Sequence, residues 1–168
     1  MTRHKSTKKH KAGKHNGFSL IELLIVVAII LIIAAIAIPN LLRSRIAANE
    51  ASAVGSLRTL NTAEITYNMS YPSVGFACSL SSLAPASGSA TSAAAGLIDA
   101  NLASGKKSGY SFTVSNCTGT PTVSYQYAAA PVNPGTTGQR YFCTDTSGVI
   151  QYNGSAAITT CGTSTTPI

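Results

Sequence analysis

The ionisable side chains of this chain are few, and their placement argues against an active site. The three histidines all lie within the first fifteen residues, and the chain has no nucleophile-elbow, phosphate-loop or dinucleotide-binding motif. Paired-carboxylate chemistry needs two groups that converge in one pocket, which the spread of the acids does not suggest. The five acids are Glu22, Glu50, Glu64, Asp99 and Asp145. We expect Glu50 and Glu64 on a helix flank and Asp145 in a turn, all in solvated or capping roles, and we predict no enzyme activity, cofactor or metal.

The most informative chemistry lies at the junction N-G-F-S-L-I-E-L-L, residues 16–24. Glu22 is the single charge in the apolar run that follows the basic start of the chain. A carboxylate costs roughly 2.5–3.5 kcal/mol near the centre of a membrane span, and less near its end. One interpretation is a carboxylate that snorkels to the membrane interface. The other is an ion pair with a neighbouring chain, whose free α-amine on Phe18 would arise by cleavage after Gly17 and would set the axial register between subunits.

The four cysteines all follow the apolar run and show no C-x-x-C pair. A zinc cluster or a thioredoxin-like site is therefore poorly supported. An even number of cysteines in an exported domain favours two disulfides over four buried thiols. Three connectivities of Cys78, Cys117, Cys143 and Cys161 exist, and their spacing alone selects none of them.

The basic residues are concentrated at the start of the chain. Six of the twelve lie before Gly17 with no acid among them, and the rest of the chain carries a net charge of only +1. We expect this leader, residues 1–17, to be disordered because it lacks large apolar side chains after Met1. The chain has 168 residues, of which 10% are charged against about a quarter in soluble domains, so membrane or polymer contacts are expected.

The apolar run at residues 18–38 predicts a membrane-spanning helix. At ~1.5 Å per residue it reaches about 31 Å, which matches the hydrocarbon thickness of a bilayer. Six basic residues before the span outweigh Arg43 and Arg45 after it, so the N-terminus is expected in the cytoplasm. A secretory signal fits less well, because its apolar region is typically ~7–15 residues and ends in a small-residue cleavage site.

Residues 39–71 predict an amphipathic continuation of this helix. One face collects apolar side chains and the polar ones fall largely elsewhere, so the face should pack on a domain. Pro39 should kink or locally melt the helix, and Gly55 is a second weak point. We expect one bent or interrupted helix of roughly fifty residues. The predicted apolar face is Leu42, Ile46, Ala53, Leu57, Leu60 and Tyr67, against Arg45, Asn49, Glu50, Ser52 and Ser56.

Residues 72–168 predict a small outer β domain. The Ala/Ser/Gly-rich stretch 84–105 should be loop with a short helical piece near 93–102. β-like runs follow at 110–114, 123–129, 140–144 and 149–153, and the last two are joined by a tight turn at 145–148. Three or four antiparallel strands covering the amphipathic helix give an α+β fold class.

The first fifty residues resemble the type IV pilin family. The resemblance rests on the lysine-rich leader, G-F-S-L-I-E-L-L-I-V-V-A-I-I at 17–30 and A-I-A-I-P-N at 35–40. The stretch R-Y-F-C-T-D at 140–145, followed by G-V-I at 148–150, is similar to the closing strands of pilins and of the related pseudopilins. The resemblance implies the type IV pilin fold: a long N-terminal helix, half transmembrane and half amphipathic, on a disulfide-stapled antiparallel sheet.

The resemblance also implies roles for single residues. Gly17 matches the residue before the prepilin peptidase cut, and Phe18 the residue that becomes the N-methylated start of the mature subunit. Glu22 matches the glutamate that guides docking, and Pro39 the proline near which pilin helices loosen in filaments. At seventeen residues, the leader is somewhat long for the subclass of pilins with shorter leaders, although Phe18 fits that subclass.

A terminal disulfide of pilins corresponds to the pair Cys143–Cys161, which leaves Cys78–Cys117 as the second pair. The remaining two connectivities are not excluded by the residues themselves.

The resemblance implies a prepilin that polymerises into a type IV pilus for adhesion, twitching motility or DNA uptake. Its partners would be copies of itself in a helical filament, the prepilin peptidase and N-methyltransferase, and the inner-membrane assembly machinery. The subunit would be a single-pass inner-membrane protein before it joins an extracellular pilus.

The alternative is a type II secretion pseudopilin in a periplasmic pseudopilus. Four cysteines and a weakly charged outer domain favour the pilus, and Asp145 alone is too little for the calcium site that pseudopilins often carry. Lys106 and Lys107 could touch DNA phosphates, but two lysines contribute little, and a solvated loop is favoured.

Overall fold

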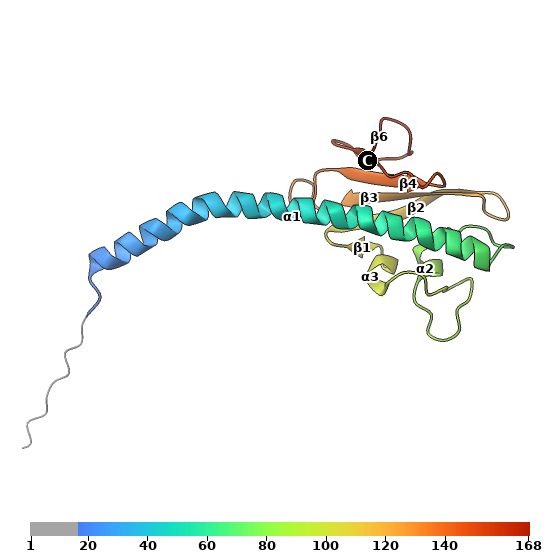
Figure 1. Ribbon diagram of the computed structural model, residues 1–168, viewed down its shortest axis with the longest axis horizontal. Coiled ribbons are helices and arrows are strands. Elements are labelled where there is room, and N and C mark those ends of the chain that lie inside the picture. Colours follow the sequence, from blue (N-terminus) through green and yellow to red (C-terminus); the bar gives the residue numbers. More distant parts are fainter. Residues whose placement is uncertain (1–16) are drawn as a thin grey trace, which may run out of the picture. The chain divides into compact units, whose positions relative to one another are not determined.

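The computed structural model describes residues 17–168, and the chain divides into two units, residues 1–39 and 40–168. The helix α1, Leu20–Ser70, contributes residues to both units (Figure 1). The predicted basic leader lies outside the described residues except for Gly17. The predicted helix of roughly fifty residues is confirmed by the 51 residues of α1.

Within the first unit, α1 is apolar around its whole circumference. Its side chains from residue 20 to residue 39 are exposed, with only Ala34 half-buried. In the described part of the chain, α1 is the one helix long and apolar enough to cross a membrane. Helical structure continues through Pro39 and Gly55, so the predicted interruption is not observed. A proline removes one backbone hydrogen bond, and the other bonds of a long helix can hold it together.

The second unit contains a six-stranded antiparallel sheet in the order β1-β2-β3-β4-β5-β6. Each strand pairs with the next along the chain, which short connections favour. The strands are β1 Lys106–Lys107, β2 Tyr110–Thr118, β3 Ser124–Pro131, β4 Tyr141–Asp145, β5 Gln151–Asn153 and β6 Thr166–Pro167. The four predicted strands correspond to β2 through β5. The two outer strands have two residues each, too short to show an alternating pattern.

Two short helices lie in the connection between α1 and the sheet. They are α2, Leu80–Leu83, and α3, Ala100–Ala103. The predicted helical piece at 93–102 overlaps α3, although it was placed too early. Asp99 caps α3, because its carboxylate accepts a hydrogen bond from the backbone N–H of Leu102 at 3.0 Å.

The core of the second unit lies between the sheet and the later part of α1. Figure 1 shows this part of α1 lying across β2, β3 and β4. Leu57, Leu60 and Tyr67 of α1 form one buried cluster with Tyr127 and Phe142 of the sheet. Five residues of the predicted apolar face are buried, which confirms most of that face.

Leu42 of the predicted face is 42% exposed, so its assignment to the core was wrong. The first buried residue of α1 is Ile46, one turn further along. Helical periodicity selects a face, but it does not say where along the helix the sheet begins.

The chain leaves α1 through a tight passage at Gly75. This glycine has φ +88°, a left-handed conformation that costs other residues energy. The backbone of Thr122 lies directly against it, so a Cβ at position 75 would overlap a backbone oxygen. Two hydrogen bonds hold Thr122 beside this segment. The Phe76 N–H donates to the Thr122 carbonyl at 3.0 Å, and the Thr122 N–H donates to the Val74 carbonyl at 2.8 Å. The passage brings the next cysteine, Cys78, toward the sheet.

Candidate functional site

The residues at the predicted processing point precede the helix. Gly17, Phe18 and Ser19 have no helical structure, and the Phe18 side chain is 84% exposed. A Cβ on Gly17 would meet no other atom within 4 Å. Gly17 and Phe18 are thus both exposed and lie outside any helix or strand.

Glu22 lies in the first turn of α1 and bonds to the backbone that enters the helix. Its Oε2 accepts a hydrogen bond from the backbone N–H of Ser19 at 2.9 Å. The Ser19 carbonyl in turn accepts bonds from the N–H groups of Glu22 and Leu23 at 3.1 and 3.3 Å. This is the glutamate half of a capping box, in which an acid at the third helical position satisfies a free donor. Among residues 17–168 the Glu22 carboxylate has no cationic partner.

The apolar side chains that follow Glu22 form a continuous exposed surface. The exposed fractions of the large ones, the Leu, Ile and Val side chains, lie between 45% and 66% from Leu23 to Ile38. Soluble monomers rarely expose contiguous apolar patches of more than a few hundred Å², and larger ones mark membrane or protein contacts. The first unit is therefore a surface that lipid or other chains must cover.

Glu50 anchors α1 to the start of β4 in the second unit. Its Oε1 accepts the backbone N–H groups of Gln139 and Arg140 at 2.9 and 3.1 Å, and its Oε2 accepts the Arg140 guanidinium at 2.7 Å. The guanidinium carbon also lies 5.4 Å from the ring centres of Phe142 and Tyr152. Burial by itself would raise the pKa of Glu50, but these hydrogen bonds and the charge of Arg140 lower the pKa below 4.5.

Glu64 anchors α1 to β3 and to the chain that follows α1. Its Oε1 accepts the Tyr127 hydroxyl at 2.5 Å, and its Oε2 accepts the Ala77 N–H at 2.7 Å. The side chain is 0% exposed and has no cationic partner in the described part of the chain. Burial raises the pKa of Glu64 to about 7, although both hydrogen bonds act to lower it.

The expectation that Glu50 and Glu64 are solvated was wrong, since both are buried. A signal for this burial is present in the sequence. Glu50, Leu57 and Glu64 are spaced seven residues apart, close to two helical turns, so both acids share a face with a core leucine. An acid on an apolar face indicates a specific partner on the opposing element.

The cysteines lie in two pairs at disulfide distance. Cys78 with Cys117, and Cys143 with Cys161, both have Cα–Cα separations of 5.9 Å, within the usual range for disulfides. The first pair joins the segment after α1 to β2, and the second joins β4 to the C-terminal loop. The sequence left three connectivities open. The two pairs that lie at disulfide distance are the ones that the pilin resemblance implied.

Three further polar groups considered in the sequence are Asp99, Lys107 and Asp145. No cluster of three or more His, Cys, Asp or Glu side chains able to hold a metal ion occurs in residues 17–168. Asp145 lies in the predicted turn, where its Oδ1 accepts the Ser147 N–H at 2.9 Å. Lys107 forms a 2.8 Å ion pair with Asp99, which neutralises half of the two-lysine spot considered for DNA.

Two comparisons with known proteins concern the N-terminal region. Residues 13–38 match the family model described as prokaryotic N-terminal methylation motif. A segment of 54 residues is 46% identical to "Type IV major pilin protein PilA" of Myxococcus xanthus (strain DK1622). This segment covers 32% of the chain and 24% of that protein, so the chain spans about a quarter of the relative it matches. No solved structure matches the chain.

Proposed function

With the methylation motif and the pilin match supporting the type IV pilin family, we propose that the chain is a prepilin that polymerises through α1 into a type IV pilus. The observation that carries the proposal is the first unit: a helix apolar on every side, exposed throughout, with one acid in its first turn. Such a surface requires a bilayer before assembly and other subunits afterwards. The subunit is structural, in keeping with a family that is not enzymatic.

Processing takes place at the Gly17–Phe18 bond. A prepilin peptidase hydrolyses this peptide bond, which leaves a carboxylate on Gly17 and a free α-amine on Phe18 that is then methylated. The non-helical backbone and open surroundings of Gly17 support this site, because a protease needs an extended and accessible chain.

Assembly uses the amine that processing creates. In the uncut chain the Glu22 carboxylate caps the backbone N–H of Ser19. In the filament we expect this carboxylate to pair with the α-amine of Phe18 in a neighbouring subunit. A pair buried among apolar helices is costly to break by removing one partner, so it selects a single axial register.

The unassembled subunit is anchored in the inner membrane by residues 18–38, with its N-terminus in the cytoplasm and the second unit outside. Disulfides at Cys78–Cys117 and Cys143–Cys161 form in that oxidising environment and stabilise the outer unit. The assembled filament serves adhesion, twitching motility or DNA uptake.

Mass spectrometry of the N-terminus tests the proposal, on filaments sheared from the cell surface and on the membrane fraction. We expect N-methylated Phe18 in the sheared filaments. Methylated Phe18 confined to the membrane fraction would favour a periplasmic pseudopilus. An intact leader in both fractions would overturn the proposal.

Two substitutions separate the pairing role of Glu22 from its capping role. Glu22→Ala removes both the charge and the bond to Ser19, whereas Glu22→Gln keeps an oxygen that can accept the Ser19 N–H. We expect both variants to insert in the membrane and both to lose filaments. Normal filament yield from the glutamine variant would assign Glu22 to helix capping alone.

A further inference from the structure

The charged groups of the second unit leave one acid and a few cations without partners. The ion pairs within residues 40–168 are Glu50 with Arg140 and Asp99 with Lys107. Asp145 takes part in neither of them, and Glu64 is buried. Arg58, near the middle of the outer part of α1, is exposed and also has no acidic partner among the described residues. A half-buried acid, Asp145, and an exposed cation, Arg58, therefore remain available to bind another chain.

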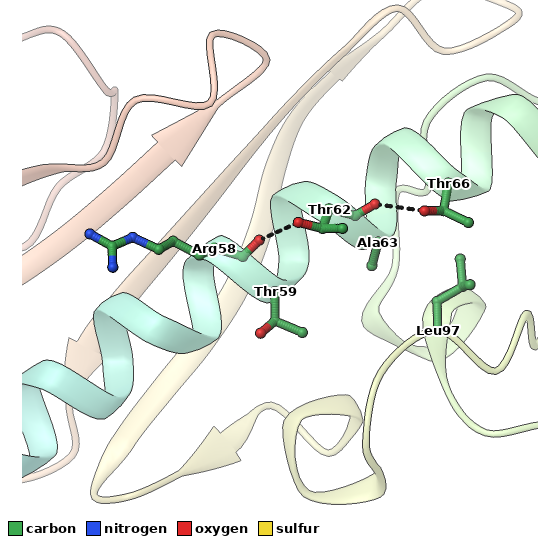
Figure 2. Close-up of a pocket in the computed structure, with 6 residues that line it drawn as sticks. All are labelled: Arg58, Thr59, Thr62, Ala63, Thr66 and Leu97. Atoms are coloured by element: carbon green, nitrogen blue, oxygen red, sulfur yellow. Dashed lines mark hydrogen bonds between the residues drawn. The ribbon is translucent and has the colours of Figure 1, made fainter.

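Arg58 stands at one end of a groove along α1, shown in Figure 2. The groove has a volume of about 330 Å³, and its other wall is the loop that carries Leu97. In Figure 2 the Arg58 side chain extends away from Leu97 and from the threonines of the groove. The lining residues are Arg58, Thr59, Thr62, Ala63, Thr66 and Leu97.

The threonines of this groove direct their hydroxyls back to their own helix. Thr59, Thr62 and Thr66 donate to the carbonyls four residues earlier, at 3.1, 3.1 and 2.9 Å. With these donors satisfied, the groove presents methyl groups and the Leu97 side chain, and the Arg58 cation extends beyond one end of it. Its chemistry fits a small segment that carries one negative charge.

The turn between β4 and β5 is such a segment. Residues 146–149 are exposed, and three of the four residues of the turn have small side chains: Thr146, Ser147 and Gly148. The Asp145 carboxylate accepts the Ser147 N–H at 2.9 Å, and the Asp145 carbonyl accepts the Gly148 N–H at 2.9 Å. These bonds fix the shape of the turn before any contact, so little entropy is lost on binding.

The turn and the groove lie on opposite flanks of α1. Asn61 holds the turn on one flank, donating to Thr144 Oγ1 at 2.8 Å and to Gly148 O at 3.3 Å. Ala63, two residues further and so about 200° around the helix, lines the groove on the other flank. A chain cannot therefore fill its own groove with its own turn.

We propose that the Asp145–Gly148 turn of one copy of this chain docks in the Arg58 groove of the next copy, with Asp145 paired to Arg58. The proposal rests on the proposed function and names a contact between the outer units of the filament. Two different surfaces that meet head to tail form a heterologous interface, which continues into a helical filament when the rotation does not close a ring.

Arg58 fits this contact better than the other unpaired cations. Arg43 and Arg45 precede Ile46, the first buried residue of α1, and neither of them lines the groove. Lys106 lies on the two-residue strand β1, outside the residues that line the groove. It therefore serves as a matched control for a change of surface charge.

Charge reversal in the full-length chain tests the contact, with filament yield measured in the sheared fraction. Arg58→Glu and Asp145→Arg should each lower the yield about tenfold, because each places like charges opposite one another. The double variant Arg58→Glu/Asp145→Arg restores an opposite-charge pair and should recover most of the yield. Lys106→Glu should leave the yield unchanged, and equal amounts of subunit in the membrane fraction verify folding.

A second measurement locates the contact independently of charge. In filaments carrying both Thr62→Cys and Thr146→Cys, we expect disulfide-linked ladders of subunits on non-reducing gels, and none with either change alone. Normal yield from both single charge reversals, or absence of the ladder, would overturn the docking contact and leave the pilus proposal standing. Absence of filaments from the unmodified chain would overturn both.

Discussion

Replacing Glu64 by glutamine should remove a pH dependence from the stability of the outer unit. Glu64 is a fully buried residue of α1 and bonds to the Tyr127 hydroxyl and to the Ala77 N–H. A glutamine of nearly the same shape can accept the Ala77 N–H and donate to the Tyr127 oxygen. The substitution therefore keeps the packing and the hydrogen bonds while removing the titratable group.

The magnitude follows from the difference in pKa between the folded and unfolded chain. Burial raises the pKa of Glu64 from 4.5 to about 7, so between these values the folded state binds more protons than the unfolded state. Stability must then fall as pH rises through this window. At 1.36 kcal/mol per pKa unit, the free energy of unfolding should decrease by about 3 kcal/mol from pH 4.5 to pH 7.

Denaturant unfolding of the full-length chain in detergent, followed by tyrosine circular dichroism, measures this effect. The seven tyrosines serve as probes because the chain has no tryptophan. The free energy of unfolding of the unmodified chain should fall by about 3 kcal/mol relative to that of Glu64→Gln as pH rises from 4.5 to 7.

Glu50→Gln is the control, because hydrogen bonds and Arg140 hold the pKa of Glu50 below 4.5. The stability contributed by Glu50 is lost as pH falls toward that lowered pKa. The difference in free energy of unfolding between the unmodified chain and Glu50→Gln should therefore stay nearly constant between pH 4.5 and pH 7, since both chains retain Glu64. Parallel pH profiles for the unmodified chain and Glu64→Gln would refute the conclusion that burial dominates at Glu64.

Three further changes test the contacts that hold the outer unit. Arg140→Ala should lower the free energy of unfolding by about 1–3 kcal/mol in denaturant titrations, because it leaves buried Glu50 with only its backbone donors; an unchanged value would make the pair dispensable. Gly75→Ala should cost about 1–3 kcal/mol through its left-handed backbone and the overlap with the facing backbone of Thr122, and a melting curve like that of the unmodified chain would contradict the tight passage. Removing the Cys143–Cys161 pair by serine substitution should cost about 3 kcal/mol for a loop with a sequence separation of 18, and should lower the melting temperature by several degrees; no shift would argue against a structural disulfide.

Glu50 and Glu64 together fix the position of α1 on the sheet. Glu50 bonds to the backbone at the start of β4, whereas Glu64 bonds to a side chain of β3 and to the chain after α1. A helix that slid by one turn would leave both carboxylates buried without donors, which is strongly unfavourable. Apolar packing alone tolerates such shifts more readily, because its contacts have no direction.

The elements whose causes are local could be predicted from the sequence. The apolar run and its single acid Glu22 predicted the first half of α1, and 3.6-residue periodicity predicted most of the buried face of the second half. The strands and the turn at Asp145 followed from alternating patterns and from turn-forming residues. In each case the cause lies within a few residues along the chain.

The features that need a partner distant in sequence became visible in the fold alone. Glu64 was read as a solvated flank residue because its partners, Tyr127 and Ala77, are 63 and 13 residues away. Burial of Glu50 depends on Arg140, 90 residues away. The sequence also left open whether the helix would be bent or interrupted at Pro39, because a proline's local penalty does not show whether the surrounding turns compensate for it. Whether a polar side chain is buried depends on what the opposing element donates, and no local pattern carries that information.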